Sequence, residues 1–289
     1  MKGSRRAFTL PELLVVLVIL VILAGMLVPV FFSVRNAAKK IACVTNFHEA
    51  SLAANLYLAD YDDTYMPVNY HPPADEANSK NDRTWAQLIL PYAPDFGIFR
   101  CPSDSSDRPR REATFEADLV PGDTYSQYYT ASLRTNLGFN FVYFSPIYQF
   151  GDNWVARPNS SSSIAHPEET YMFIDSVWSL DENHEPNGGG SWLVVPPCRD
   201  YTDGSDSFKS DPSIPGVYTN DATGWDVGQV GSPLQYGQAW PWHNGKMTVV
   251  TADGSAKTVS PKEIVQGCHL APNWTGDIYD ADKYHWDLR

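Results

Sequence analysis

The longest apolar run of the chain lies near its beginning. Leu13 to Phe32 is a stretch of twenty residues without a charged side chain, and twenty helical residues are long enough to cross the hydrocarbon core of a membrane. Three basic residues, Lys2, Arg5 and Arg6, precede the run. Because basic flanks stay on the cytoplasmic side, we expect a single-pass membrane protein with a cytoplasmic N-terminus and its C-terminal bulk outside.

Two residues interrupt the apolar pattern. Glu12 stands at the edge of the run, where a carboxylate in hydrocarbon is costly unless it has a partner. Pro29 lies inside the run, where it removes a backbone hydrogen bond and predicts a kink or a locally melted stretch. Glu12 therefore needs a group that neutralises it.

The helical pattern continues beyond the apolar run. From Ser33 to about Asp60, apolar residues recur at steps of three and four positions, which predicts an amphipathic helix with one face on a globular domain. The face consists of Cys43, Phe47, Ala50, Ala54 and Tyr57, with Leu52 and Leu56 beside it.

The pattern changes at Tyr61, after which Pro and Gly become frequent. Short strand-like runs occur at Tyr171–Asp175, Ser191–Val195 and Met247–Ala252. They predict an antiparallel β-sheet with long irregular connections. The expected fold class is α+β, with a long N-terminal helix packed on a β-rich head.

The net charge of the chain limits the classes of partner that the head can bind. The 289-residue chain has a formal net charge of -13 and an isoelectric point near 4.8. A surface this acidic argues against nucleic acid as a partner and is compatible with divalent cations.

The four cysteines, Cys43, Cys101, Cys198 and Cys268, all follow the apolar run, and no C-x-x-C pair occurs. An exterior location allows disulfides, and four cysteines allow three pairings. We favour Cys43 with Cys101 and Cys198 with Cys268; free buried thiols are the alternative.

The beginning of the chain has a specific order of features: a basic leader, Ala7, the sequence Phe8-Thr9-Leu10-Pro11-Glu12, and the apolar helix. This order resembles the class III signal of type IV pilins and type II secretion pseudopilins. The resemblance implies that a prepilin peptidase cleaves between Ala7 and Phe8 and that Phe8 is N-methylated. Ala7 departs from the glycine that the family usually has. The alternative is a plain single-pass anchor with a chance Glu12.

The same resemblance implies a partner for Glu12. Cleavage would create an α-amino group on Phe8, and the Glu12 carboxylate could pair with that amine in a neighbouring subunit or in its own chain, which would neutralise both charges. Implied partners are copies of this chain or other pilins in a filament, the prepilin peptidase and the cytoplasmic membrane.

Four further stretches resemble a large pilin-like family with a C-terminal H-x9-DG domain. They are IACVTNFHEASLAANLYLADYDDTYMP, LILPYAPDFGIFRCPSD, HPEETYMFIDS and HNGKMTVVTADGS. The expected organisation is a leader over residues 1–7, a membrane and filament helix over 8–32, its amphipathic continuation over 33–60 and an exterior head over 61–289, with the H-x9-DG hairpin at 243–260.

The last of these stretches predicts a hairpin. His243-Asn244-Gly245 indicates a turn, Lys246–Ala252 a strand, and Asp253-Gly254 a tight turn in which the glycine supplies positive φ, before a return strand over Ser255–Val259. His243 and Asp253 would lie about 30 Å apart at about 3.3 Å per residue. We therefore interpret them as structural turn residues and not as a catalytic pair.

One loop has the chemistry of a cation site. Its oxygen-bearing side chains suit calcium, which makes Ca²⁺ the one candidate cofactor. The alternative, which we favour, is a solvated acidic loop. The residues are Asp200, Asp203, Asp206, Ser207 and Asp211, and a weaker acidic cluster at Asp60, Asp62 and Asp63 fits the solvated end of the long helix.

Enzymatic motifs are missing: there is no G-x-S-x-G elbow, no H-E-x-x-H and no P-loop. We therefore expect a structural subunit and not an enzyme. One alternative is an exported adhesive or glycan-binding module that stacks sugars on Trp225, Trp240 or Trp242, although these aromatic residues also suit a core or a filament interface. Another is a minor pseudopilin that primes a secretion system.

Overall fold

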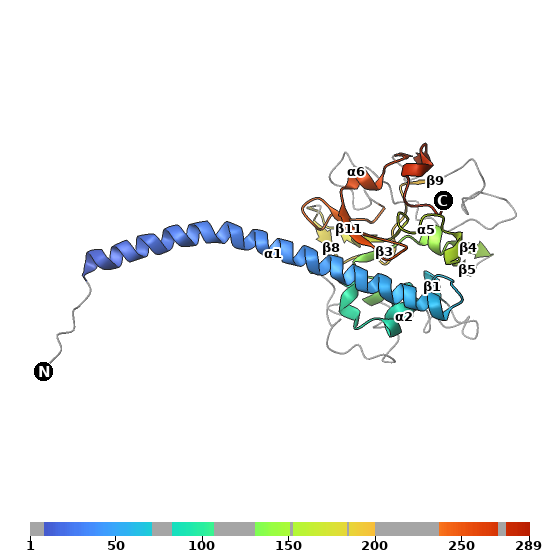
Figure 1. Cartoon of the computed structure of the whole chain (residues 1–289), viewed down its shortest axis with the longest axis horizontal. Helices are drawn as coiled ribbons and strands as arrows, with labels where there is room; N and C mark the ends of the chain where they lie inside the picture. Colours follow the sequence, from blue (N-terminus) through green and yellow to red (C-terminus); the bar gives the residue numbers. More distant parts are fainter. Residues whose placement is uncertain are drawn as a thin grey trace.

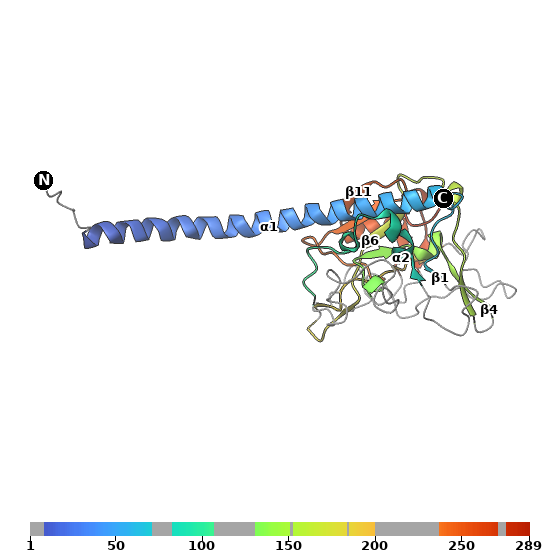
Figure 2. The same ribbon diagram turned by 90° about the horizontal axis from the view of Figure 1, so that it is seen from below.

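The computed structural model describes residues 9–70, 83–106, 131–150, 153–183, 185–199, 237–270 and 276–289. A single long helix, α1 (Leu10–Asp60), carries a β-containing head at its C-terminal half, and its N-terminal half projects away from the head (Figures 1 and 2). The architecture confirms the α+β class expected from the sequence.

Helix α1 is continuous over 51 residues. Pro11 lies in its first turn, where a missing N–H group costs nothing. Pro29 lies in the helix interior, yet the helix continues through it and curves gently (Figure 1). Of the kink or melted stretch predicted at Pro29, the melted stretch is wrong, because the loss of one hydrogen bond bends a helix without ending it.

The C-terminal half of α1 is amphipathic, as its spacing predicts. Three small residues, Ala50, Ala53 and Ala54, are buried and let the helix backbone approach the sheet closely. The remaining members of the predicted face, Cys43, Phe47 and Tyr57, are also buried. Leu52 and Leu56 remain 49% and 47% exposed, so they lie outside the packed face.

The central sheet has four antiparallel strands in the order β11-β10-β6-β3. These strands are β3 (Leu137–Phe139), β6 (Tyr171–Asp175), β10 (Met247–Thr251) and β11 (Ala256–Val259). Helix α1 packs on β10 and β11. The predicted strand at Tyr171–Asp175 is confirmed, and the one at Met247–Ala252 is confirmed to within one residue.

The strand predicted at Ser191–Val195 is wrong. The segment passes β3 with a single bridge, between Leu193 and Phe139. The Ser191 hydroxyl donates to the Leu193 carbonyl oxygen, and the Ser191 N–H donates to the Ser176 hydroxyl. Because a side-chain hydroxyl takes the Ser191 N–H, this residue makes no strand hydrogen bond through it, and the pairing with β3 stays limited to the one bridge.

Small elements surround the central sheet. The short strands pair as β1-β2, β4-β5, β7-β8 and β12-β13-β9. They are β1 (Asn69–Tyr70), β2 (Arg83–Thr84), β4 (Ile147–Phe150), β5 (Asn153–Ala156), β7 (Ser179–Leu180), β8 (Pro186–Asn187), β9 (Cys198–Arg199), β12 (Cys268–His269) and β13 (Gly276–Ile278). The short helices are α2 (Trp85–Ile89), α5 (Phe141–Phe144) and α6 (Pro261–Ile264), with 3-10 turns at Leu90–Tyr92, Phe96–Phe99, Ser161–Ser163 and Ala281–Lys283.

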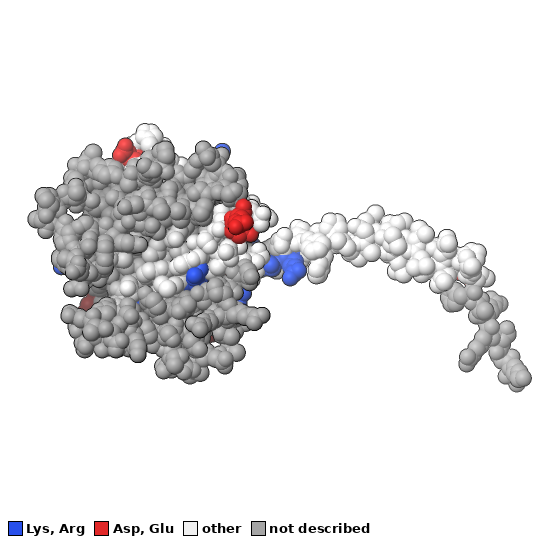
Figure 3. Space-filling model, turned by 180° about the vertical axis from the view of Figure 1, so that it is seen from behind, with Lys and Arg blue, Asp and Glu red and all other residues white. Residues whose placement is uncertain are grey.

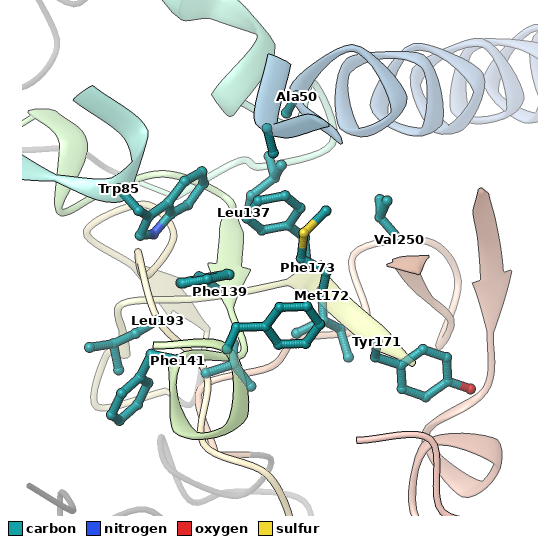
Figure 4. Packing of buried hydrophobic residues seen from close by; sticks show 14 of the residues in the cluster. Ala50, Trp85, Leu137, Phe139, Phe141, Tyr171, Met172, Phe173, Leu193 and Val250 are labelled. Carbon is teal, nitrogen blue, oxygen red and sulfur yellow. The ribbon is translucent and has the colours of Figure 1, made fainter. Parts of the chain in front are cut away.

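The core between α1, α2 and the sheet is rich in aromatic side chains (Figure 4). The ring of Trp85 lies 4.8 Å from that of Phe173 and 5.7 Å from that of Phe99. Its indole N–H donates to the carbonyl oxygen of Trp192, so the one polar atom of this side chain is satisfied. This core fixes the face of the sheet on which α1 lies.

Two disulfides join distant segments: Cys43–Cys101 and Cys198–Cys268. They are the pairs expected from the sequence. The first fixes α1 to the loop that follows the 3-10 turn at Phe96–Phe99. The two cysteines are 58 positions apart in the sequence. A crosslink over a loop of this length lowers the entropy of the unfolded chain, which stabilises the folded state by about 4 kcal/mol. The second disulfide links β9 to β12.

Candidate functional site

The projecting half of α1 is an apolar surface without cover. Among the described residues, α1 is the one helix long and apolar enough to cross a membrane, and none of its apolar stretch is buried. Leu14, Leu20 and Phe32 are each 56% exposed, and the apolar residues between them are exposed to a similar degree. A surface of this size requires lipid or other apolar helices around it.

Glu12 has partners within its own chain. Its carboxylate accepts hydrogen bonds from the Thr9 backbone N–H at 2.9 Å and from the Thr9 hydroxyl at 2.7 Å. The position in the first turn also places the negative charge at the positive end of the helix dipole. Sequence reasoning missed Thr9. Ala7 and Phe8 lie outside the described residues, so the pairing of Glu12 with the Phe8 amine stays a prediction.

In the head, the H-x9-DG stretch begins with a tight hairpin turn. The backbone N–H of His243 donates to the carbonyl oxygen of Lys246 at 3.0 Å, and the Lys246 N–H donates back at 3.1 Å. Asn244 and Gly245 have φ angles of 52° and 77°. An Asn-Gly pair with positive φ is the usual two-residue hairpin connection, and the predicted turn is therefore confirmed.

The His243 side chain lies at the junction of three segments and is 6% exposed. Its Nδ1 lies 3.3 Å from the Ser103 hydroxyl, and its Nε2 lies 3.7 Å from the Cys101 sulfur and 3.5 Å from a carboxyl oxygen of Asp175. His243 thus reaches the disulfide that holds α1 and the end of strand β6. The sequence predicts only its place in a turn.

Electrostatics favour neutral forms of both His243 and Asp175. Burial raises the pKa of Asp175 to about 8, against a hydrogen bond from the Thr248 N–H that lowers it. Burial, assisted by the charge of Lys40, lowers the pKa of His243 to about 4. Ser103, His243 and Asp175 are residue types of hydrolase triads, but such a triad requires an ionised carboxylate beside the imidazole. We therefore interpret the contacts among Ser103, His243 and Asp175 as structural and not catalytic.

The other end of the motif docks on α1. The Asp253 carboxylate accepts hydrogen bonds from the Thr251 hydroxyl and from the N–H and hydroxyl of Ser255. Partial burial acts to raise the Asp253 pKa, but these bonds outweigh it and the pKa is lowered. Gly254 has a φ of 95°, as predicted. Its carbonyl oxygen lies 3.0 Å from Nδ1 of His48, which must carry the proton to donate.

The N-terminal segment has a match among known families. Residues 2–28 match the prokaryotic N-terminal methylation motif. This motif indicates pilin-like processing and assembly through the N-terminal helix, and together with the apolar half of α1 it fits membrane anchoring. It also favours a structural subunit over an enzyme. No curated protein and no solved structure matches the chain significantly.

Metal chemistry finds little support within the described residues. The one group there with metal-ligand spacing is Cys43, Cys101 and His243, and its cysteines form a disulfide, which offers no thiolate. At the end of α1, Asp60 accepts a hydrogen bond from Tyr92, while Asp62 and Asp63 are exposed in a turn. The calcium candidates Asp200, Asp203, Asp206, Ser207 and Asp211 lie outside the described residues.

The candidate sugar-binding tryptophans do not form a flat platform. The rings of Trp240 and Trp242 are 6.5 Å apart and inclined at 66°. The Trp242 indole N–H donates to the Ser176 carbonyl oxygen, so this side chain is fixed against the head. Trp225 lies outside the described residues.

Proposed function

We propose that this chain is a pilin-like structural subunit of a type IV pilus or a type II secretion pseudopilus. The observation that carries the proposal is the contrast within α1. Its first half, under the methylation motif and just beyond it, exposes apolar side chains all round, whereas its second half is packed on the head. Such a helix needs a bilayer before assembly and the helices of other subunits afterwards.

The proposed processing rests on the methylation motif at residues 2–28. Residues 1–7 form the leader, 8–32 the membrane and filament helix, 33–60 its amphipathic continuation and 61–289 the exterior head. Cleavage between Ala7 and Phe8 places a new ammonium group beside Thr9, within reach of the Glu12 carboxylate. In a filament the same carboxylate can take the Phe8 amine of a neighbour, which sets the axial register of the subunits.

The head is of the H-x9-DG kind in this proposal, and the motif has a mechanical role. One end of the β10 hairpin places His243 against the Cys43–Cys101 disulfide. The other end bonds to His48 and Ser51 of α1 through Gly254. The hairpin therefore holds α1 on the sheet at two points. A helix that transmits force along a filament needs a firm attachment of this type.

The test is the composition of the filament. Fibres sheared from the cell surface and purified should contain this chain when analysed by mass spectrometry. An abundance close to that of the main component indicates a major subunit, and a small fraction indicates a minor one. Finding the chain only in washed membranes, with fibres free of it and no multimers after chemical crosslinking in the membrane, would contradict the proposal.

A further inference from the structure

A polar pocket lies where α1 emerges from the head. It has a volume of about 310 Å³, and five of its lining residues come from α1 and four from the head. They are Ser33, Asn36, Ala37, Lys39 and Lys40 of α1, and Ser103, Trp242, His243 and Asn244 of the head. The pocket is a feature of the junction and of neither part alone.

The lining suits an anion. It contains two lysines and no carboxylate. Lys39 and Lys40 are half-buried, and neither forms an ion pair within the part of the chain that the structure describes. The Ser103 hydroxyl and the amide groups of Asn36 and Asn244 add neutral donors. Within the described residues, two half-buried cations without an ion pair are a local exception in a chain of net charge -13.

The charge of Lys40 lies close to the floor of the pocket. His243, which forms part of that floor, has its pKa lowered by its burial and also by the nearby Lys40 ammonium. The His243 ring contacts Ser103 and Asp175, so the head positions the floor of the pocket. Figure 3 shows Lys and Arg side chains gathered on the helix where it meets the head.

The height of the pocket along the helix identifies the source of the anion. Ser33 directly follows Phe32, the last residue of the uncharged run. Residues 33–40 extend over roughly 10 Å at about 1.5 Å per residue, and the headgroup layer on each side of the hydrocarbon core is roughly 5–8 Å thick. With the apolar run inserted, the part of the pocket lined by residues 33–37 lies at the level of the headgroups, and the flexible side chains of Lys39 and Lys40 lie just above it.

We propose that this pocket binds the phosphate of an anionic phospholipid in the membrane that holds α1. Lys39 and Lys40 supply the charge, and Ser103, Asn36 and Asn244 the hydrogen bonds. The inference rests on the membrane insertion of the proposed function. A lipid in this position holds the head at a fixed height and orientation above the bilayer until the subunit is extracted, when the site is vacated.

The experiment uses the full chain in nanodiscs that contain equal amounts of phosphatidylglycerol and phosphatidylcholine. After release into mild detergent, native mass spectrometry counts the lipids that stay bound. Wild type should retain phosphatidylglycerol in preference to phosphatidylcholine. In the Lys39→Gln/Lys40→Gln variant, the ratio of retained phosphatidylglycerol to retained phosphatidylcholine should be about tenfold lower than in wild type. The matched control Lys262→Gln/Lys283→Gln removes two exposed charges from the head and should behave as wild type.

The outcomes separate the two proposals. A chain that fails to enter nanodiscs overturns the membrane helix and this inference together. Insertion without preference for phosphatidylglycerol, or equal retention by the Lys39/Lys40 variant, overturns the lipid site alone. Inorganic phosphate is added in a further arm. Complete displacement of the lipid by millimolar phosphate would identify free phosphate as the ligand and overturn the lipid assignment.

Discussion

The imidazole of His243 lies 3.5 Å from the carboxyl of Asp175, with both side chains buried. This contact joins the turn that begins the β10 hairpin to the end of β6, directly beside the disulfide that fixes α1. The attachment of α1 to the head thus includes a contact between two buried titratable groups whose shifted pKa values favour their neutral forms. Its strength is measurable.

Replacing His243 should weaken the head. His243→Ala removes a packed ring and leaves Asp175 and Ser103 without that neighbour, so the free energy of unfolding should fall by about 2–3 kcal/mol. Chemical denaturation of the full chain in detergent, followed by tryptophan fluorescence, measures this. The control is His166→Ala, at a side chain 63% exposed, where about 0.5 kcal/mol or less is expected. Equal effects would show that His243 is no junction residue.

The pair also predicts the pH dependence of stability. Asp175 titrates near 8 when folded and near 3.8 when unfolded, so its contribution falls as pH rises between these values. His243 titrates near 4 when folded and near 6.5 when unfolded, so its contribution rises with pH over that window. The two oppose each other up to about pH 6.5, and only Asp175 acts between 6.5 and 8.

Stability should therefore fall by about 1–2 kcal/mol between pH 6.5 and 8. The variant Asp175→Asn keeps the shape and cannot ionise, so this fall should disappear. Denaturation curves at several pH values test both statements. A wild-type stability that rises over this window, or a fall that persists in Asp175→Asn, would exclude the assigned titration.

Gly254 and Gly245 form a matched pair for the docking of the motif on α1. Both have positive φ, 95° and 77°. A Cβ at Gly254 would lie 3.3 Å from the Asn55 side chain and 3.4 Å from the Ser51 hydroxyl, whereas a Cβ at Gly245 would meet nothing within 4 Å. Gly245→Ala should cost about 1 kcal/mol of strain and Gly254→Ala about 1–2 kcal/mol, because crowding against α1 adds to it. Equal losses in thermal or chemical unfolding would mean that the turn does not press on α1.

Glu12 should matter for assembly and little for insertion. Glu12→Val removes the carboxylate and adds apolar surface, so the membrane level of the protein should be unchanged while the filament yield falls at least tenfold. Immunoblots of membrane and sheared-fibre fractions measure both. The control Glu168→Gln changes an exposed carboxylate of the head and should leave the yield unchanged. Normal fibres with Glu12→Val would refute the pairing with Phe8.

The periodicity of apolar residues predicted the long helix and two strands of the central sheet correctly. The buried face of α1 follows from its helical spacing, and β6 and β10 follow from apolar runs bounded by turn residues. Ser191–Val195 has the same apolar character but pairs with β3 through a single bridge, because the N–H and hydroxyl of Ser191 bond to Ser176 and Leu193 instead. Whether such a run becomes a strand depends on whether the folded sheet offers a neighbouring strand with free backbone groups, and the periodicity of the sequence does not show this.

The candidate sites also contain features that local sequence predicts and features that depend on contacts between distant segments. The turns at His243 and at Asp253–Gly254 follow from the residue types of tight turns. The contact of His243 with Ser103 and Asp175 joins segments 140 and 68 positions apart in the chain, which no spacing rule connects. The pocket at Lys39 and Lys40 was missed for the same reason. Its one signal in the sequence is a pair of lysines shortly after an uncharged run.

The most direct test of the central claim is the intact mass and N-terminal sequence of the protein extracted from its own membrane. Processing as a prepilin predicts a chain that begins at N-methylated Phe8, with the mass of residues 1–7 lost. That result gives Glu12 the amine it needs. A chain that still begins at Met1 would contradict the account and leave an anchored exterior domain in place of a filament subunit.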